Sequence, residues 1–190
     1  MQRKEFWIFI VVAALAITAG CKGGPTVFVH QNADFSSIRK VAILPFETLT
    51  QDRSVADKVQ KILTIEILSL GAFEVVEPGQ VQKVLREQRI ENAAAMAPAE
   101  IKQIGAALGV QALLFGSVVD FGESRVGTNP APEVTIQLRL VETQSGLTLW
   151  SASHTRAGAK WSTRLFGVGG ETPTQAAQIL MRQEIGTILK

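Results

Sequence analysis

Continuous apolar runs in this sequence alternate with segments in which apolar residues recur at helical spacing. In the stretch 39–46, the residues after Arg39 and Lys40 form a continuous apolar run that includes the β-branched Val41 and Ile43 and is too short for a helix. Such a run predicts a strand that is buried on both faces. From residue 54 to residue 70 the apolar residues instead recur three and four positions apart, which predicts a helix. Ser54 and Asp57 resemble a capping box at its start, and Gly71 suits its C-terminal cap.

The alternation of strand and helix patterns continues through the middle of the chain. A second strand is expected at 72–77, and helices are expected to open at Pro78 and Pro98, because proline is favoured in the first turn of a helix. An apolar run at 110–121 predicts another buried strand. Within 133–142, the residues from Val134 to Leu140 alternate strictly between apolar and polar side chains, which predicts a half-buried strand with one wet face.

The remaining segments complete a single domain. A turn at 143–146 leads to a hairpin partner at 147–154, and 173–189 has the pattern of a closing helix, while 26–30 reads as a short strand or extended lead-in. After this lead-in the order is β-α-β-α-α-β-β-β-α. It predicts an α/β (α+β) fold in which helices pack on one mixed sheet.

The N-terminus has a different pattern. Arg3 and Lys4 precede an uncharged apolar run at 6–19, which is followed by small residues and Cys21, the only cysteine. This is the pattern of an export signal, and the run is shorter than the roughly 20 residues that a spanning helix needs. The Ala-Gly-Cys sequence resembles the lipobox of bacterial lipoproteins, although Thr18 stands where these most often have Leu. An ordinary cleaved signal with a stray cysteine, or an uncleaved anchor helix, are the alternatives.

The lipobox resemblance implies an organisation and a location. We expect a cleaved signal peptide at 1–20, a lipidated Cys21 with a short tether at 21–25, and a periplasmic domain at 26–190. In lipoproteins an aspartate after the cysteine tends to keep the protein in the inner membrane, but this chain has Lys22 there. We therefore expect a lipid anchor in the outer membrane with the domain facing the periplasm, and no cofactor besides the covalent lipid.

Composition and spacing disfavour several functional classes. The formal net charge is +2, and the 19 basic residues form no cluster of the kind that nucleic-acid binding requires. The two histidines lie far apart in sequence, and His154 is expected on the wet face of its hairpin strand. The sequence has no nucleophile elbow, no phosphate-binding loop and no spaced set of metal ligands. We therefore expect a protein that is not an enzyme and does not bind nucleic acid.

Four stretches carry a resemblance to a known family: "KVAILPFE", "FEVVEPGQVQKVLREQ", "LGVQALLFGSVVDF" and "LRLVETQSGLTLWSAS". They resemble the family of the curli secretion channel lipoprotein CsgG and its smaller relatives, which include the activator LpoB and lipoproteins related to the N-terminal domain of TolB. The resemblance covers roughly 38–152 and the last helix. It implies a non-enzymatic lipoprotein that acts by protein–protein interaction in cell-envelope or surface-structure assembly or secretion. The alternative is an activator or accessory lipoprotein of a peptidoglycan synthase, a penicillin-binding protein.

Two surfaces are candidates for contacts with envelope proteins or with other copies. The loop at 157–172 carries apolar residues among basic ones and is a candidate partner- or membrane-contact loop. The residues expected to make the contact are Trp161, Arg164, Leu165 and Phe166. The alternative is that their apolar side chains fold back onto the edge of the sheet. Ile65 and Leu68 widen the apolar face of the 54–70 helix beyond one stripe. They are a candidate homo-oligomer face, unless a further helix packs over them.

Overall fold

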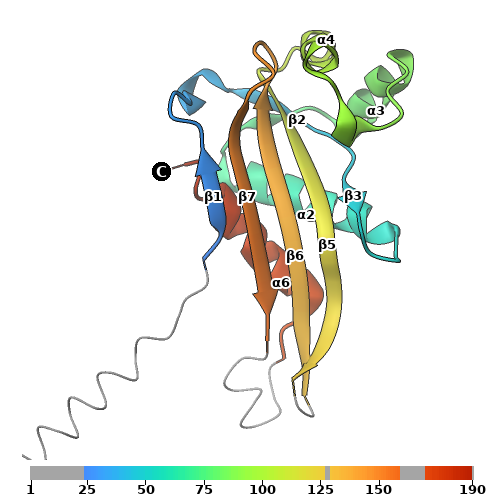
Figure 1. The fold of residues 1–190 in the computed structure, drawn as a ribbon, viewed down its shortest axis with the longest axis vertical. Coiled ribbons are helices and arrows are strands. Elements are labelled where there is room, and N and C mark those ends of the chain that lie inside the picture. The colour runs from blue at the N-terminus through green and yellow to red at the C-terminus, as the bar shows by residue number, and fades with distance from the viewer. Residues whose placement is uncertain (1–23, 127–128, 159–169, 190) are drawn as a thin grey trace, which may run out of the picture.

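The computed structural model describes residues 24–126, 129–158 and 170–189, and these form one mixed sheet with helices on both faces (Figure 1). The elements in chain order are β1 (Thr26–Val29), η1 (Phe35–Ser37), β2 (Lys40–Ile43), β3 (Glu47–Thr48), α2 (Ser54–Leu70), β4 (Glu74–Val75), α3 (Pro78–Glu87), η2 (Ala93–Ala95), α4 (Pro98–Leu108), β5 (Ala112–Val126), β6 (Asn129–Glu142), β7 (Thr148–Ala157) and α6 (Pro173–Ile185). This order confirms the predicted fold class.

The sheet combines an antiparallel meander with a parallel half. Its strand order is β1-β7-β6-β5-β2-β4, and β3 also pairs with β5. Strands β5, β6 and β7 are antiparallel neighbours, whereas β2 runs parallel to both β5 and β4. Strand β1 pairs with β7 on one side only and forms one edge of the sheet.

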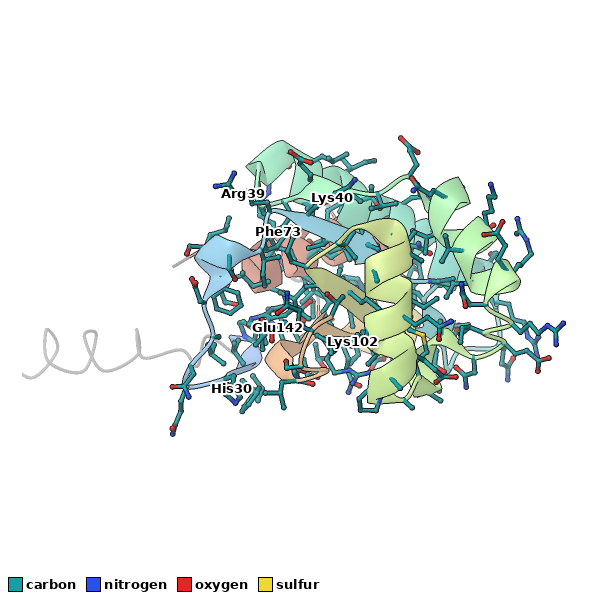
Figure 2. All side chains as sticks on the ribbon, turned by 90° about the horizontal axis from the view of Figure 1, so that it is seen from above. His30, Arg39, Lys40, Phe73, Lys102 and Glu142 are labelled. Atoms are coloured by element: carbon teal, nitrogen blue, oxygen red, sulfur yellow. The ribbon has the colours of Figure 1, made fainter. Side chains whose placement is uncertain are left out.

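Helices cover the two faces unequally. Helices α2 and α6 cover one face along the meander, where they bury the larger core cluster around Leu63, Trp150 and Leu180. Helices α3 and α4 cover the other face only over β2 and the start of β5, around a second cluster that includes Leu44 and Ile104. Seen along the strands in Figure 2, α4 with its Lys102 lies on one side of the sheet and α6 on the other.

The lower part of the second face carries no helix among the described residues. In Figure 1 this face of β5, β6 and β7 is turned toward the viewer, with α2 and α6 behind it. Its side chains are polar and at least partly exposed, as the alternation of 133–142 predicted for β6. We call this part of the sheet the uncovered face and define it by seven residues: Ser117, Thr135, Gln137, Arg139, Ser151, Ser153 and Thr155.

The β5–β6 hairpin is longer than the apolar pattern predicted. The two strands continue beyond residue 121 and start before residue 133, although the added part of β6 contains Pro130 and Pro132. The pairing of β6 with β7 begins only at Glu133, opposite Ala157. Along 129–132 the prolines therefore interrupt no ladder with β7, and proline is tolerated where its missing N–H has no partner strand.

Two local predictions were wrong. Helix α2 has no capping box: Asp52 lies two residues upstream, and its Oδ1 accepts hydrogen bonds from the Ser54 backbone N–H and hydroxyl at 2.9 and 2.7 Å.

His154 is not on the wet face but is 7% exposed. The β6–β7 register shifts next to Leu140, so that one extra residue of β7 reverses the alternation after Leu149. His154 consequently points to the face that α6 covers.

Candidate functional site

Helix α2 presents an apolar stripe on the face that it turns away from the sheet. Its inward positions, such as Val59, Leu63 and Ile67, are fully buried. Ile65 and Leu68 lie on the opposite side and are 62% and 56% exposed. No further helix of the described residues covers them. The α2 stripe, which we define as Ile65 and Leu68, is therefore an exposed apolar surface on a rigid element.

The edge strand β1 exposes a second set of apolar groups. Phe28 is 52% exposed, and its neighbour Val29 is also exposed. The register pairs Phe28 with Ser151, so its ring lies beside the polar side chains of the uncovered face. The outer edge of β1 has no partner strand among the described residues, and such an edge is a template for pairing with another chain.

A cavity of about 190 Å³ opens where the α3–α4 layer ends and the uncovered face begins. Phe115 provides an apolar surface in it, and Ala94 of η2 forms the wall on the helical side. The polar lining converges from four neighbouring strands, namely Glu47 of β3, Ser117 of β5, Gln137 and Arg139 of β6 and Ser151 of β7.

Arg139 is the basic side chain in the lining of this cavity. Its guanidinium lies 4.3 Å from the ring centroid of Phe115, which is cation–π geometry. Partial burial lowers the pKa of Arg139 below its ordinary value, because burial disfavours the charged form. None of the ion pairs formed within the described residues includes Arg139 or Glu47.

Three glutamates of the described residues are buried, namely Glu66 on α2, Glu171 just before α6 and Glu184 on α6, and they are of two kinds. Glu171 accepts two hydrogen bonds from the Arg156 guanidinium, each of 3.0 Å, and Glu66 accepts one of 2.9 Å from Arg182. Glu184 differs, because it is fully buried and neither carboxylate oxygen has a hydrogen-bond partner within the described residues. Burial raises the pKa of Glu184 to about 9, so this carboxyl group is neutral at pH 7.

The described residues contain no group of three or more side chains placed to hold a metal ion. The two histidines lie on different elements: His30 follows β1, where its Nδ1 accepts a hydrogen bond from the Asn32 backbone, and His154 is buried in β7. Of the helices in the described part of the chain, none combines the length and apolar character needed to cross a bilayer.

Most of the site residues expected from the sequence lie outside the described residues. These are Cys21 and the contact-loop residues Trp161, Arg164, Leu165 and Phe166. Ile65 and Leu68, by contrast, are described and exposed. The sequence pattern placed Arg139 and Gln137 on a wet strand face, but it did not indicate the cavity. No local signal showed that Phe115, Glu47 and Arg139, which are distant in sequence, line one space.

Comparison with known proteins identifies the family. The family model described as "Curli production assembly/transport component CsgG" matches residues 29–183, and the chain belongs to this family. The resemblance found in the sequence is thus confirmed. No curated protein matches the chain closely enough to count as a relative.

Solved structures of low sequence identity share the fold. The PelC dodecamer from Paraburkholderia phytofirmans superimposes with a TM-score of 0.60 at 17% identity, covering 86% of this chain and 95% of that one. A point variant of PelC from the same organism, also a dodecamer, gives the same TM-score and identity, with 87% and 98% covered. Lipoprotein GNA1162 from Neisseria meningitidis matches with a TM-score of 0.53 at 22% identity, over 63% of this chain and 83% of that one.

Proposed function

We propose that this protein is a non-enzymatic lipoprotein, anchored in the outer membrane, whose periplasmic domain acts by protein–protein contacts in the assembly or secretion of envelope or surface material. The observation that carries this proposal is the family match over 29–183, because the family is described as a curli assembly and transport component. Within the described residues, the candidate contact surfaces are the apolar α2 stripe and the edge strand β1, which suit binding to another protein.

Self-association through the α2 stripe is part of the proposal. Ile65 and Leu68 follow each other at helical spacing on a helix that the core holds firmly. Each of these side chains is a little more than half exposed, so covering the rest of it is worth roughly 1–2 kcal/mol. The dodecamers of PelC, whose fold this chain shares, support an assembly of several copies.

The first experiment measures the mass and composition of the complex extracted from membranes in mild detergent. We expect a homo-oligomer, and we expect the Ile65→Asp, Leu68→Asp double variant to dissociate, because two charges cannot be buried in an apolar contact. Leu147→Asp is the matched control, since Leu147 is 50% exposed and lies in the β6–β7 turn. A small complex with a different envelope protein, such as a peptidoglycan synthase, would instead favour the accessory-lipoprotein alternative. A monomer would contradict self-association.

The anchor is tested by replacing the cysteine. We expect Cys21→Ser to abolish incorporation of labelled palmitate and to move the protein out of the outer-membrane fraction. The core clusters are built from residues between Val27 and Ile188, so the thermal unfolding of the domain should stay unchanged. Incorporation of palmitate by the Cys21→Ser variant would contradict the anchor.

The contact loop at 157–172 is tested separately. Binding to vesicles or to the extracted partner is compared for the wild type and a Trp161→Ala, Phe166→Ala double variant. We expect weaker binding with unchanged thermal stability. Unchanged binding together with lower stability would mean that these side chains belong to the domain itself.

A further inference from the structure

The cavity beside η2 brings together groups of opposite charge that do not neutralise each other. Glu47 is exposed on β3, and Arg139 is half-buried on β6, yet they form no ion pair. The register explains their separation. Glu47 pairs with Ser117, Ser117 pairs with Gln137, and Arg139 follows two residues further along β6. Strand spacing of about 4.8 Å and a rise of about 3.4 Å per residue place the two backbones roughly 12 Å apart.

The two charges therefore flank the cavity with polar groups between them. Ser117 and Gln137 lie in this interval, and their side chains make no hydrogen bond within the described part of the chain. Ser151 donates its hydroxyl to the Leu138 carbonyl at 3.1 Å, which leaves the oxygen lone pairs of that hydroxyl available. The arrangement has a few convergent polar groups around an apolar surface, as small-ligand sites do.

The state of Arg139 shows which ligand group suits this end of the cavity. Its guanidinium contacts the Phe115 ring and forms no ion pair within the described residues. The N–H donors of a guanidinium lie in its own plane, where they match the two oxygens of a carboxylate. Burial lowers the pKa of Arg139 by disfavouring its charged form, and an anion beside it would stabilise that charged form.

The opposite end selects against a plain anion. The Glu47 carboxylate repels a second negative charge and attracts an ammonium group. The volume of about 190 Å³ is below the range of roughly 300–1,000 Å³ that is typical of sites for drug-sized ligands. A ligand about the size of one or two small amino-acid residues fits this limit.

We propose that this cavity binds a small zwitterion, a free amino acid or a short peptide, with its carboxylate on Arg139 and its ammonium on Glu47. Ser117, Gln137 and Ser151 hydrogen-bond the ligand between its charges, and Phe115 contacts its apolar part. This site lies on the sheet face opposite to α2, so the inference is independent of the self-association proposed above.

The test is a ligand-observed NMR titration of the full-length protein in detergent micelles, at ligand concentrations up to about 10 mM. The probes are alanine, alanyl-alanine, N-acetylalanine, which lacks the ammonium, and alaninamide, which lacks the carboxylate. We expect one of the two zwitterions to bind saturably, and both blocked forms to bind about tenfold more weakly. The preference between alanine and alanyl-alanine shows whether the site takes a free amino acid or a short peptide, because the ammonium and the carboxylate are further apart in the dipeptide.

Variants assign each charge to its residue. Glu47→Gln should remove the preference for the zwitterion over N-acetylalanine, and Arg139→Gln should remove the preference for it over alaninamide. Ser153→Ala, on the uncovered face but not in the cavity lining, is the matched control and should bind like wild type. Glu47 is exposed, so its variant tests the site even if Arg139→Gln folds poorly. Absence of saturable binding by either zwitterion, or binding that Glu47→Gln leaves unchanged, would overturn the proposal.

Discussion

Glu184 makes the stability of this protein depend on pH in a direction opposite to that of most carboxylates. Its side chain is fully buried on α6 and has no hydrogen-bond partner within the described residues. Burial raises its pKa from 4.5 to about 9. The folded protein therefore keeps the Glu184 proton over a pH range in which the unfolded chain releases it.

The sign and size of the effect follow from proton linkage. Between pH 4.5 and about 9 the folded state binds one proton more than the unfolded state, so the free energy of unfolding falls as pH rises. The loss is about 1.4 kcal/mol per pH unit, and it reaches roughly 3 kcal/mol at pH 7. Below pH 4.5 both states are protonated, and the contribution of Glu184 no longer changes with pH.

Glu184→Gln replaces the titratable carboxyl group with an amide that does not titrate, and it keeps the size and polarity of the side chain. Urea unfolding of wild type and variant should give free energies within about 1 kcal/mol of each other at about pH 5 and a variant that is more stable by roughly 5 kcal/mol at about pH 8. Measuring the difference between the two proteins cancels the titration of all other groups. Glu171→Gln is the matched control, because Glu171 is also buried but is paired with Arg156. Its loss should destabilise the protein by roughly 2–3 kcal/mol at neutral pH.

A difference in unfolding free energy between Glu184→Gln and wild type that stays constant from about pH 5 to about pH 8 would contradict the raised pKa of Glu184. Glu184 would then have the same charge in the folded and the unfolded protein at each pH in that range. Greater stability of Glu171→Gln at neutral pH would contradict the distinction between paired and unpaired buried carboxylates.

Two further substitutions test the packing of the larger core. Gly116→Ala should cost about 1–3 kcal/mol, because its Cβ would overlap with the Phe46 ring. Gly122→Ala, in the same strand with no atom within 4 Å of the added Cβ, should cost clearly less, and equal losses in urea unfolding would disprove the overlap. Trp150→Phe should cost about 1–3 kcal/mol, because the Trp150 Nε1 donates to Thr187 Oγ1 at 2.9 Å and the indole fills more of the core; an unchanged unfolding midpoint would contradict this.

The positions of the helices were largely predictable because their signals are local. The apolar spacing of 54–70 and the glycine with φ of 62° at position 71 define α2 within a few neighbouring residues. Likewise, Pro78 and Pro98 open their helices at the first position, and Gly109 with φ of 63° ends the second. Each of these helix start and stop signals acts within one helical turn, so the local sequence is sufficient to predict it.

The ends of the strands and the orientation of individual side chains were not predictable in the same way. The hairpin continues past residue 121 because β5 and β6 pair with each other where β7 has ended. His154 is buried because a register shift in another part of β7 reverses the alternation. Both outcomes depend on the pairing with a neighbouring strand, and the sequence pattern of one segment does not contain that pairing.

The longer helices and strands, the fold class and the family could be inferred from the sequence, since they follow from local spacing and from the patterns of strands and turns, whereas the two-residue strand β3 was not predicted. Which polar groups are hidden and which converge became visible only in the folded chain. Glu184 is buried because α6 turns it toward the sheet together with Leu180 and Met181. Glu47 and Arg139 line one cavity because the strand register places residues distant in sequence side by side. Burial and convergence are properties of contacts between elements, so the sequence pattern of a single element does not contain them.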